Sequence, residues 1–555
     1  MTSTVPSTEQ INRPATGTTD ERLDEVFAPI FARIAEGAVQ REDDRRLAYD
    51  EVAWLREAKF GALRVPVEFG GYGASIRQLF RLLIDLAAAE SNLPQALRVH
   101  WSFVEDQLAA LPDEAAQQWL RKVGEGTLVG NAITEPGVGA IDRYQTRLTP
   151  DPASTDGSGF RLDGTKYYST GSLYSDHILV AADQDGERVS VLVDADADGV
   201  TQHDDWDGFG QRLTASGTTE FAGVEVPAER VLGPGYGGEG RTYATSYLQL
   251  VQLSVLAGIA ARATDDVVEW VRNRTRTFTH STADLPRQDP LVQQVIGRLS
   301  AAAYTARTLV LDIADELDEL ALAGWEDAAL LDRVEFDVAR AQAAVIPAVL
   351  DATTQLFEVG GASITSERLR LDRHWRNARV ISVHNPLIFK LQAVGDQRAR
   401  LPGLDLAVPR LVAVEHVVGD AGAAGVGEEL GAEADEPARG HLELHPDPAG
   451  AVVGHLLHAP LAGGHQLGDR AEVLLGGVDR EVLDRLVHLA VDLAGDHLRL
   501  ADGQLVSLTA HLLHQDRQCQ LAATLDLPGV GTLGGQHAQR HVADQLGVQP
   551  VLDQP

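Results

Sequence analysis

Two short segments of the chain carry polar side chains that could hold a flat heteroaromatic ligand. The first, VGNAITEPGVGA, is a short apolar strand that begins at Val129 and runs into a Thr-Glu-Pro-Gly turn. The second is LDGTKYYSTGS, in which Gly164 and Gly171 bracket a polar run. A turn after a strand exposes backbone N–H groups and hydroxyls at the strand end, where they can bond a ligand. Both segments therefore suggest a binding site built on strand ends.

The candidate ligand contacts are the polar side chains at these strand ends and one aromatic side chain on the loop DDWDGFG. They are Asn131, Thr134, Tyr168, Ser169, Thr170 and Trp206. Hydroxyls and amides at strand ends are ordinary turn formers at least as often as they are ligand contacts. The residues alone therefore leave both interpretations open.

A histidine at a predicted helix break is the candidate for acid–base chemistry. In WRNARVISVHNPLIFK, His384 precedes Asn385 and Pro386. A proline disfavours helical geometry in the residue before it, so a helix is predicted to end near His384. A histidine in this position can be a cap, a core residue or a catalyst. The polar cluster just before it is unlike a plain core helix, and this favours a functional role.

The elements that must position these residues follow from the spacing of apolar side chains. Residues 21–128 show helical spacing, residues 129–235 read as strands separated by Asp/Gly turns, and residues 236–397 return to long amphipathic helices. The clearest strands are HILVAA, RVSVLVDA and TTEFAGVEV. Residues 1–20 are polar and predict a disordered leader. Helices, then a β-domain, then a helical bundle make an α+β order that few folds use.

Composition excludes several classes of protein. The 555 residues include 81 acidic and 47 basic side chains, for a formal charge of −34, which argues against a phosphate-binding nucleic-acid surface. A single cysteine, Cys519, excludes an intramolecular disulfide and fits a reducing cytosol. The polar N-terminus is not a signal peptide, and no run of 18 uncharged apolar residues predicts a membrane span. We therefore expect a cytoplasmic protein.

The composition changes sharply in residues 398–555. From residue 401 onward there is no Phe, Trp, Tyr, Ile, Lys, Asn or Met, although this segment holds 12 of the 18 histidines. Aromatic side chains bury the largest areas in a core, so their absence is unfavourable for packing. We predict a tail that is not a selected domain, with loose or disordered structure. The rival interpretation is a small Leu/Val helical domain.

Four short segments suggest other cofactors only weakly. GYGGEG and GVGTLG satisfy GxGxxG, but neither opens a strand–helix–strand unit with a later acidic residue, so a nicotinamide site is not expected. HLELH and HLLH in the tail place histidines at helical spacing that could bind a metal. No carboxylate is placed as in a zinc-binding HExxH helix, and we expect no metal site.

Over about residues 25–397 the sequence resembles the flavin monooxygenase branch of the acyl-CoA dehydrogenase superfamily. The matching stretches, in the same order and spacing, are GNAITE, FRLDGTKYYSTGSLYSDHILV, GVTQHDDWDGFGQRLTASGTTEFAGVEV, FEVGGAS and LDRHWRNARVISVHNPLIFKLQAVGD. The resemblance implies the acyl-CoA dehydrogenase fold, with an N-terminal helical domain, a central β-domain and a C-terminal four-helix bundle. It also implies a homotetramer in which the flavin lies where subunits meet.

The resemblance assigns expected roles to individual residues. Asn131 and Thr134 would bond the flavin ring, and Thr170 stands where the family has a serine near flavin N5. Tyr168 replaces a Phe beside the ring, and Trp206 would pack against it. Arg276 would reach the flavin phosphate. The expected catalytic residues are His384, His100 and Thr170, and the expected cofactor contacts are Asn131, Thr134, Tyr168, Ser169, Thr170, Trp206 and Arg276. Ile381 stands where some members have a second histidine.

The resemblance also implies a reaction. The expected function is a two-component monooxygenase that takes reduced FMN from a separate reductase, forms a C4a-hydroperoxyflavin and oxygenates a small apolar organosulfur or related heteroatom compound. One alternative is an acyl-CoA dehydrogenase that uses FAD, but such enzymes need a carboxylate base beside the flavin. The loop ISVHNP, where many of them carry a glutamate, has no acid. Another alternative is an inactive flavin-fold protein that acts through interactions.

Overall fold

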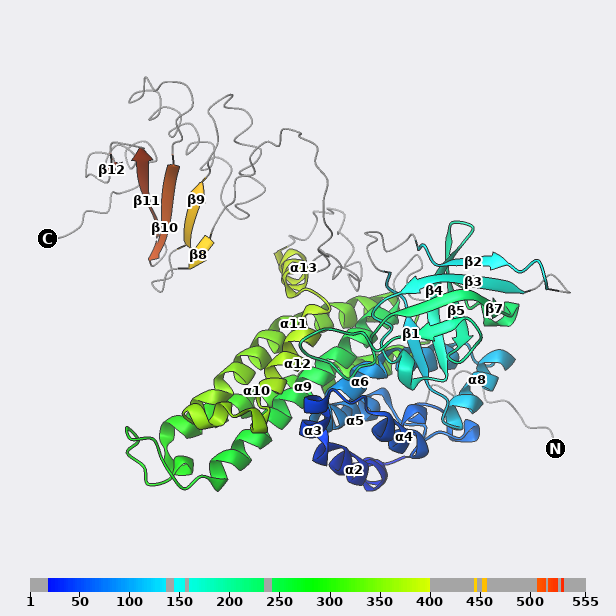
Figure 1. The fold of residues 1–555 in the computed structure, drawn as a ribbon, viewed down its shortest axis with the longest axis horizontal. Helices are drawn as coiled ribbons and strands as arrows, with labels where there is room; N and C mark the ends of the chain where they lie inside the picture. The colour runs from blue at the N-terminus through cyan, green and yellow to red at the C-terminus, as the bar shows by residue number, and fades with distance from the viewer. Residues whose placement is uncertain are drawn as a thin grey trace, which may run out of the picture. The chain divides into compact units, whose positions relative to one another are not determined.

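The computed structural model describes residues 18–135, 144–154, 159–233 and 242–399, together with five short strands between residues 444 and 533. The chain divides into two compact units, 1–423 and 424–555. The first unit has helices at its N-terminal end, a sheet in the middle and a bundle of long helices after it (Figure 1). This order agrees with the predicted one.

The N-terminal part is made of short and medium helices. They are α2 (Asp20–Glu36), α3 (Ala38–Asp44), α4 (Tyr49–Glu57), α5 (Ile76–Ala89), α6 (Asn92–Ala96), α7 (Arg98–Ala109) and α8 (Glu114–Gly124), with the short 3₁₀ turns η1 (Phe60–Ala62) and η2 (Val67–Phe69). Helix α5 begins with a capping box, in which the Ser75 hydroxyl accepts the Gln78 N–H and the Gln78 side chain accepts the Ser75 N–H. The predicted leader, 1–20, lies outside the described residues up to position 17.

A seven-stranded sheet follows, and it carries the strand ends of the predicted site. Its strands are β1 (Val129–Ala132), β2 (Arg147–Pro150), β3 (Phe160–Lys166), β4 (His177–Gln184), β5 (Glu187–Asp194), β6 (Val200–Gln202) and β7 (Thr219–Val226). Their order is β1-β4-β2-β3-β7-β6, and β5 pairs with β4. Strand β4 is parallel to β1 and β2, whereas the other pairs are antiparallel. The strands predicted from HILVAA, RVSVLVDA and TTEFAGVEV are confirmed as β4, β5 and β7.

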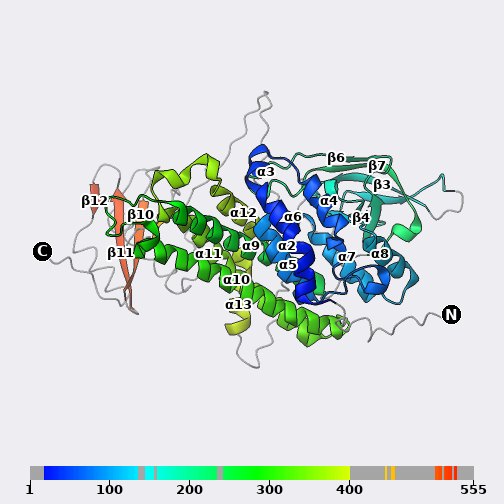
Figure 2. The same cartoon turned by 90° about the horizontal axis from the view of Figure 1, so that it is seen from below.

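The helical bundle is built around one central apolar helix. Its members are α9 (Tyr243–Asn273), α10 (Pro290–Leu322), α11 (Ala328–Gln355), α12 (Asp372–Val383) and α13 (Leu387–Ala399). Helices α9, α10 and α11 run side by side (Figure 2). Helix α9 is long and apolar enough to cross a membrane by length and composition, but 89% of its most apolar 18-residue stretch is buried inside the protein. This burial identifies α9 as the core helix of the bundle.

The close packing of α9 against α5 depends on one glycine. A Cβ atom added at Gly258 would lie 2.4 Å from Cβ of Ala87 and 2.6 Å from the Ile84 carbonyl oxygen. The two helices could not approach this closely with any larger residue. This contact joins the N-terminal helices to the bundle.

In the second unit the described residues are all strand residues. They form one antiparallel sheet with the order β12-β11-β10-β9-β8, in which the strands are β8 (Leu444–Pro446), β9 (Val452–Leu456), β10 (Ser507–Gln515), β11 (Gln518–Leu527) and β12 (Gly531–Leu533). The second HLLH segment lies within β10, so its backbone is an extended strand and not a helix. Its helical spacing is therefore not realised. The prediction of disorder for 398–555 falls mostly on residues outside the described ranges.

Candidate active site

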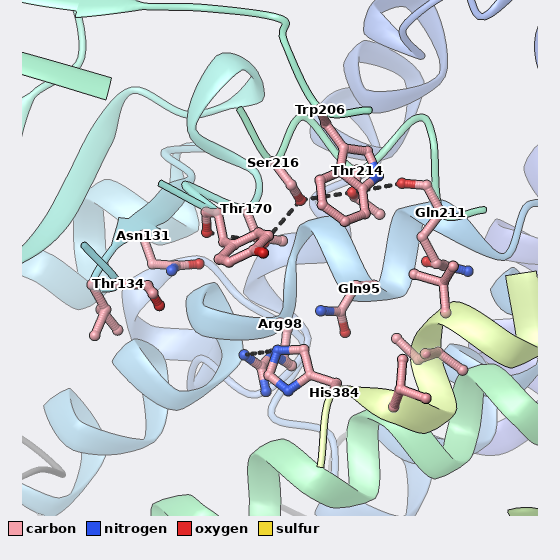
Figure 3. Close-up of a pocket in the computed structure, with 15 residues that line it drawn as sticks. Gln95, Arg98, Asn131, Thr134, Thr170, Trp206, Gln211, Thr214, Ser216 and His384 are labelled. Atoms are coloured by element: carbon pink, nitrogen blue, oxygen red, sulfur yellow. Dashed lines mark hydrogen bonds between the residues drawn. The ribbon is translucent and has the colours of Figure 1, made fainter. Parts of the chain in front are cut away.

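A pocket lies where the β-domain meets the helices on either side of it. Its cavity volume is about 130 Å³. Its walls come from α6 and α7, from the ends of β1 and β3, from the loop before β7 and from the end of α12 (Figure 3). The lining residues are Gln95, Arg98, Asn131, Ile133, Thr134, Tyr168, Thr170, Trp206, Gln211, Thr214, Ser216, Val380, Ile381, Val383 and His384.

The strand-end segments VGNAITEPGVGA and LDGTKYYSTGS are bonded to each other at the pocket. The Asn131 N–H donates to the Thr170 carbonyl oxygen at 3.3 Å, and the Tyr167 N–H donates to the Thr134 carbonyl oxygen at 2.8 Å. These bonds fix both strand ends, so Asn131 and Thr134 face the pocket together. The Asn131 side-chain oxygen is buried and has no hydrogen-bond partner among the described residues. It is an acceptor that a ligand can satisfy.

The turn after β3 has a backbone shape that only certain residues allow. Tyr168 has φ 57° and Gly171 has φ 76°. A Cβ atom at Gly171 would lie 2.0 Å from the Ala96 carbonyl oxygen, so this position needs glycine both for its conformation and for space. Burial, with a further contribution from Asp207, raises the pKa of the Tyr168 hydroxyl, which therefore stays neutral. Strain of this kind is commonly held at ligand sites by the surrounding structure.

The loop before β7 supplies a chain of hydroxyls that the sequence analysis did not single out. Thr170 Oγ1 lies 2.9 Å from Ser216 Oγ, which in turn lies 2.7 Å from Thr214 Oγ1 (Figure 3). Thr214 Oγ1 donates to the Gln211 carbonyl oxygen at 2.9 Å. The Thr170 hydroxyl is thus oriented by a network and does not rotate freely.

Two asparagines from distant helices hold this loop in place. The Gln211 N–H donates to the Asn377 side-chain oxygen at 2.6 Å, and the Leu213 N–H donates to the Asn92 side-chain oxygen at 3.1 Å. Both asparagines are almost completely buried. The only sequence signal for this wall was the segment GFGQRLTASGTT inside a longer matching stretch, and nothing in it marked Gln211 or Ser216.

Trp206 closes the pocket next to Tyr168. Their ring centroids are 5.6 Å apart at an interplanar angle of 69°, an edge-to-face contact. The indole N–H donates to the Gly210 carbonyl oxygen at 3.3 Å, and Arg45 donates to the Trp206 carbonyl oxygen at 2.8 Å. The ring is therefore fixed and presents an apolar surface to the pocket.

The prediction that a helix ends at His384 is confirmed. Helix α12 ends at Val383, His384 is its C-cap, and α13 begins at Leu387 after Pro386. Asn385 is buried and donates to the Gln252 side-chain oxygen at 2.9 Å, which anchors the break against α9. The His384 ring lines the pocket and its Nε2 lies 3.4 Å from Arg98 Nη2 (Figure 3). Because a guanidinium can only donate, Nε2 is the acceptor, and neutral His384 carries its proton on Nδ1.

Arg98 and Gln95 are pocket residues that the sequence analysis missed. Both lie just before or at the start of α7, and both are buried. Arg98 stands two positions before His100 in LRVHWSF, and of these two residues Arg98 is the one that lines the pocket.

His100 does not line the pocket, and the prediction that it is catalytic is not supported. Its Nε2 donates to the Gly61 carbonyl oxygen at 2.9 Å, and its Nδ1 accepts the Val129 N–H at 3.3 Å. Complete burial lowers its pKa to about 4. Both ring nitrogens are occupied by backbone groups, so His100 is a neutral structural residue that ties α7 to η1 and β1.

Two more predicted cofactor contacts lie away from the pocket lining. Ser169 is fully buried behind the turn, where its N–H donates to the Gly217 carbonyl oxygen at 3.0 Å. Arg276 is exposed in the segment after α9 and does not line the pocket within this chain. The other predicted contacts, Asn131, Thr134, Tyr168, Thr170 and Trp206, are brought together as expected.

The pocket fits a flat, polar-edged ring better than it fits a metal ion. Amide and hydroxyl groups lie along one side, a fixed indole and a tyrosine provide apolar surface, and the described lining residues include no Asp or Glu. A buried acceptor on Asn131 and an oriented Thr170 hydroxyl are groups that the edge of a flavin ring can pair with.

Comparison with known proteins agrees with this fold and site. Residues 130–224 match the family described as the acyl-CoA dehydrogenase middle domain, and residues 250–387 match the acyl-CoA dehydrogenase C-terminal domain. The chain belongs to the acyl-CoA dehydrogenase superfamily, in its flavin-dependent monooxygenase branch. The predicted α+β architecture is thereby confirmed.

Two curated relatives and two solved structures define the branch. The chain is 29% identical over 394 residues to dibenzothiophene monooxygenase of Mycolicibacterium goodii, covering 66% of this chain and 91% of that protein. It is 27% identical over 381 residues to the probable FMNH2-dependent monooxygenase SfnC of Pseudomonas putida, covering 66% and 92%. FMN-bound TdsC from Paenibacillus sp. A11-2 superimposes with a TM-score of 0.63 and 26% identity, covering 69% and 98%. Methanesulfinate monooxygenase MsuC from Pseudomonas fluorescens gives 0.62 and 27%, covering 68% and 97%.

Proposed function

We propose that this protein is the oxygenase of a two-component system that oxygenates an organosulfur compound. It takes reduced FMN from a separate flavin reductase and uses O2 as the second substrate. The names of the relatives support this proposal, since they include an FMNH2-dependent monooxygenase and a protein solved with FMN. A cytoplasmic location, next to the reductase, is part of the same proposal.

The observation that carries the proposal is the composition of the pocket. Amide and hydroxyl groups on one side face a histidine on the other, and no carboxylate is present among the described lining residues. An acyl-CoA dehydrogenase needs a carboxylate to remove the proton α to a thioester. A monooxygenase has no such step and instead needs a dry pocket and a proton donor. The pocket therefore favours oxygenation over dehydrogenation.

Some residues of the pocket would hold the cofactor, and His384 would transfer a proton. Asn131, Thr134 and Thr170 would bond the polar edge of the flavin ring, and Trp206 would cover it. Bound reduced FMN supplies the two electrons with which O2 is activated. One oxygen atom goes to the sulfur and the other leaves as water, so a proton must be delivered beside the site of transfer. His384 lies in the right place to hold and pass on that proton.

The proposed oligomer gives Arg276 a role that it lacks within one chain. Arg276 is exposed beyond the end of α9, away from the pocket lining. In a homotetramer formed through the bundle it would reach the flavin phosphate of a neighbouring subunit. Sedimentation analysis of the purified protein tests the tetramer.

The test of the function compares two reactions of the purified protein. Supplied with reduced FMN and O2, the protein should convert an organosulfur compound to its oxygenated product, detected by mass spectrometry with incorporation of one ¹⁸O atom from ¹⁸O2. The same protein loaded with oxidised flavin should show no anaerobic bleaching when a saturated acyl-CoA is added. Rapid bleaching would instead identify a dehydrogenase. Failure to bind any flavin would identify an inactive member of the fold.

A further inference from the structure

A second, smaller cavity lies behind the helix break that carries His384. It is enclosed by side chains of α9, of α11 and of the segment that connects α12 to α13, and its volume is about 10 Å³. A single buried water molecule needs about 10–15 Å³ of cavity, so this space can hold one water and nothing larger. Ile381 lines both this cavity and the pocket of the candidate active site, so the two share an aliphatic wall.

Three amide side chains line the small cavity, and all three are buried. Gln252 comes from α9, Gln342 from α11 and Asn385 from the helix break. Gln252 Nε2, Gln342 Oε1 and Asn385 Oδ1 have no hydrogen-bond partner among the described residues. Buried polar atoms are nearly always bonded, either to the protein or to an ordered water molecule. Three such atoms around one cavity therefore point to a common ligand.

The three atoms match the bonding capacity of a water molecule. A water can accept the N–H of Gln252 and donate its hydrogens to the oxygen atoms of Gln342 and Asn385. Buried waters typically make about three hydrogen bonds. If the oxygen and nitrogen of both amides in the Asn385–Gln252 pair were exchanged, one donor and two acceptors would again face the cavity. The match therefore does not depend on how that pair is oriented.

The cavity connects the residue next to His384 with two long helices. Asn385 follows His384 directly, and its amide nitrogen donates to Gln252 Oε1 on α9 at 2.9 Å. A water bonded to all three amides adds a link from the break to α11. Pro386 has no N–H and interrupts the backbone hydrogen bonds of the helix. Side-chain contacts of this kind therefore fix the direction in which the chain, and with it the His384 ring, leaves α12.

We propose that Gln252, Gln342 and Asn385 bind one buried water molecule, and that this water positions His384 by tying the helix break to α9 and α11. The three amides are positioning residues, because they act through His384 and do not line the pocket. The water site stands on the geometry of the small cavity. Its effect on proton transfer rests on the proposed function.

The test uses substitutions of Gln342, which lies on α11 outside the pocket. Gln342→Met keeps the length of the side chain and removes the acceptor, whereas Gln342→Glu keeps an oxygen atom in the same place. Thr353→Val is the matched control. Thr353 is buried on the same helix, and its hydroxyl donates to the Val349 carbonyl oxygen at 2.8 Å and not into the cavity.

Two kinds of measurement are made on the FMN-loaded protein. Crystal structures show whether a water molecule lies among the three amides and where the His384 ring lies. Kinetics with methyl phenyl sulfide, reduced FMN and O2 give kcat and KM, and fluorescence titration gives the Kd for FMN. Gln342→Met is also combined with His384→Ala.

We expect wild type to show one water bonded to the three amides. Gln342→Met should lose this water and show a His384 ring that is displaced or split between orientations. Its kcat should fall about 2- to 13-fold, the effect of one neutral hydrogen bond on the fraction of correctly placed rings, while KM and the Kd for FMN change by less than about twofold.

The combined and control variants separate positioning from a general loss of stability. In the His384→Ala background, Gln342→Met should cause no further loss of kcat, because both substitutions act through the same ring. Gln342→Glu should retain the water and most of the rate, and Thr353→Val should behave as wild type.

Several results would overturn the inference. Crystals of wild type without a water among the amides would disprove the site. Loss of the water in Gln342→Met with an unmoved His384 ring and an unchanged kcat would disprove the positioning role, and so would equal losses of kcat with and without His384. If FMN-loaded wild type oxygenates neither methyl phenyl sulfide nor any other sulfur compound, the proposed function fails, and the crystal structures still decide the water site and the placement of the ring.

Discussion

His100 and His384 show how differently two histidines of one protein can be used. Both were chosen from the sequence as catalytic candidates. His100 sits inside α7 with both ring nitrogens bonded to backbone groups, and burial lowers its pKa to about 4. His384 caps the end of α12 and lines the pocket, where its Nε2 contacts Arg98. Of the two, only His384 lines the pocket, so only its ring could exchange a proton with a ligand bound there.

The largest effect is expected from His384→Ala, which tests the proposed proton-transfer role of His384. General acid–base groups typically contribute about 10²- to 10⁴-fold to a rate, and we expect a loss of kcat in this range. The variant should still bind FMN, because the predicted contacts to the flavin ring lie on the β-domain. Stopped-flow oxygenation with reduced FMN measures the rate, and fluorescence titration measures FMN affinity.

His280→Ala is the matched control for this prediction. His280 is exposed in the segment after α9 and does not line the pocket. Its replacement should leave the rate unchanged. If His384→Ala oxygenated substrate as fast as wild type with full FMN loading, the proton-transfer role of His384 would be wrong. Neither His100 nor His384 would then take part in catalysis.

The buried His100 predicts that the free energy of unfolding depends on pH. The folded pKa of His100, about 4, lies below the ordinary value of 6.5, so the unfolded chain binds the proton first as the pH falls. The free energy of unfolding should therefore decrease between about pH 6.5 and pH 4, with His100 contributing roughly 3 kcal/mol over that window. His374, whose pKa burial also lowers to about 4, acts in the same direction.

His100→Gln isolates this contribution. The variant should lose about 1–3 kcal/mol at pH 7, because the Gly61 and Val129 backbone groups lose well-placed partners. It should also lose less stability than wild type between pH 6.5 and pH 4, as followed by urea unfolding at several pH values. Activity per FMN-loaded molecule should stay within about twofold of wild type. A parallel pH dependence in both proteins would show that His100 does not titrate as proposed.

The smallest effect is expected at Thr170, a neutral group that shares the pocket with His384. Thr170→Val removes the hydroxyl that contacts Ser216 and keeps the branched shape. One neutral hydrogen bond is worth about 0.5–1.5 kcal/mol, so the Kd for FMN should rise about 2- to 13-fold. Thr170→Ser, which keeps the hydroxyl, should bind FMN as wild type does. An unchanged Kd in Thr170→Val would mean that the hydroxyl serves only the loop network.

The regular elements could be predicted because their causes are local. The apolar spacing of residues 76–87 predicts helix α5, and the short apolar runs HILVAA and RVSVLVDA, bounded by Asp/Gly turns, predict strands β4 and β5. The break at His384 follows from the steric demand of Pro386 on the residue before it. The positions of Asn131, Thr134 and Thr170 at strand ends follow from the same strands and their turns.

What the sequence by itself determined is therefore the helix–sheet–helix order, the strand-end side chains and the helix break that carries His384. Only the tertiary structure decided which side of α7 faces the pocket. Residues two apart on a helix point in nearly opposite directions, so Arg98 enters the pocket while His100 turns toward Gly61 and Val129. The loop that carries Gln211 and Ser216 was likewise fixed by Asn92 and Asn377, more than 100 residues away in either direction. Such contacts depend on how distant elements pack together, and no local pattern in the sequence records them.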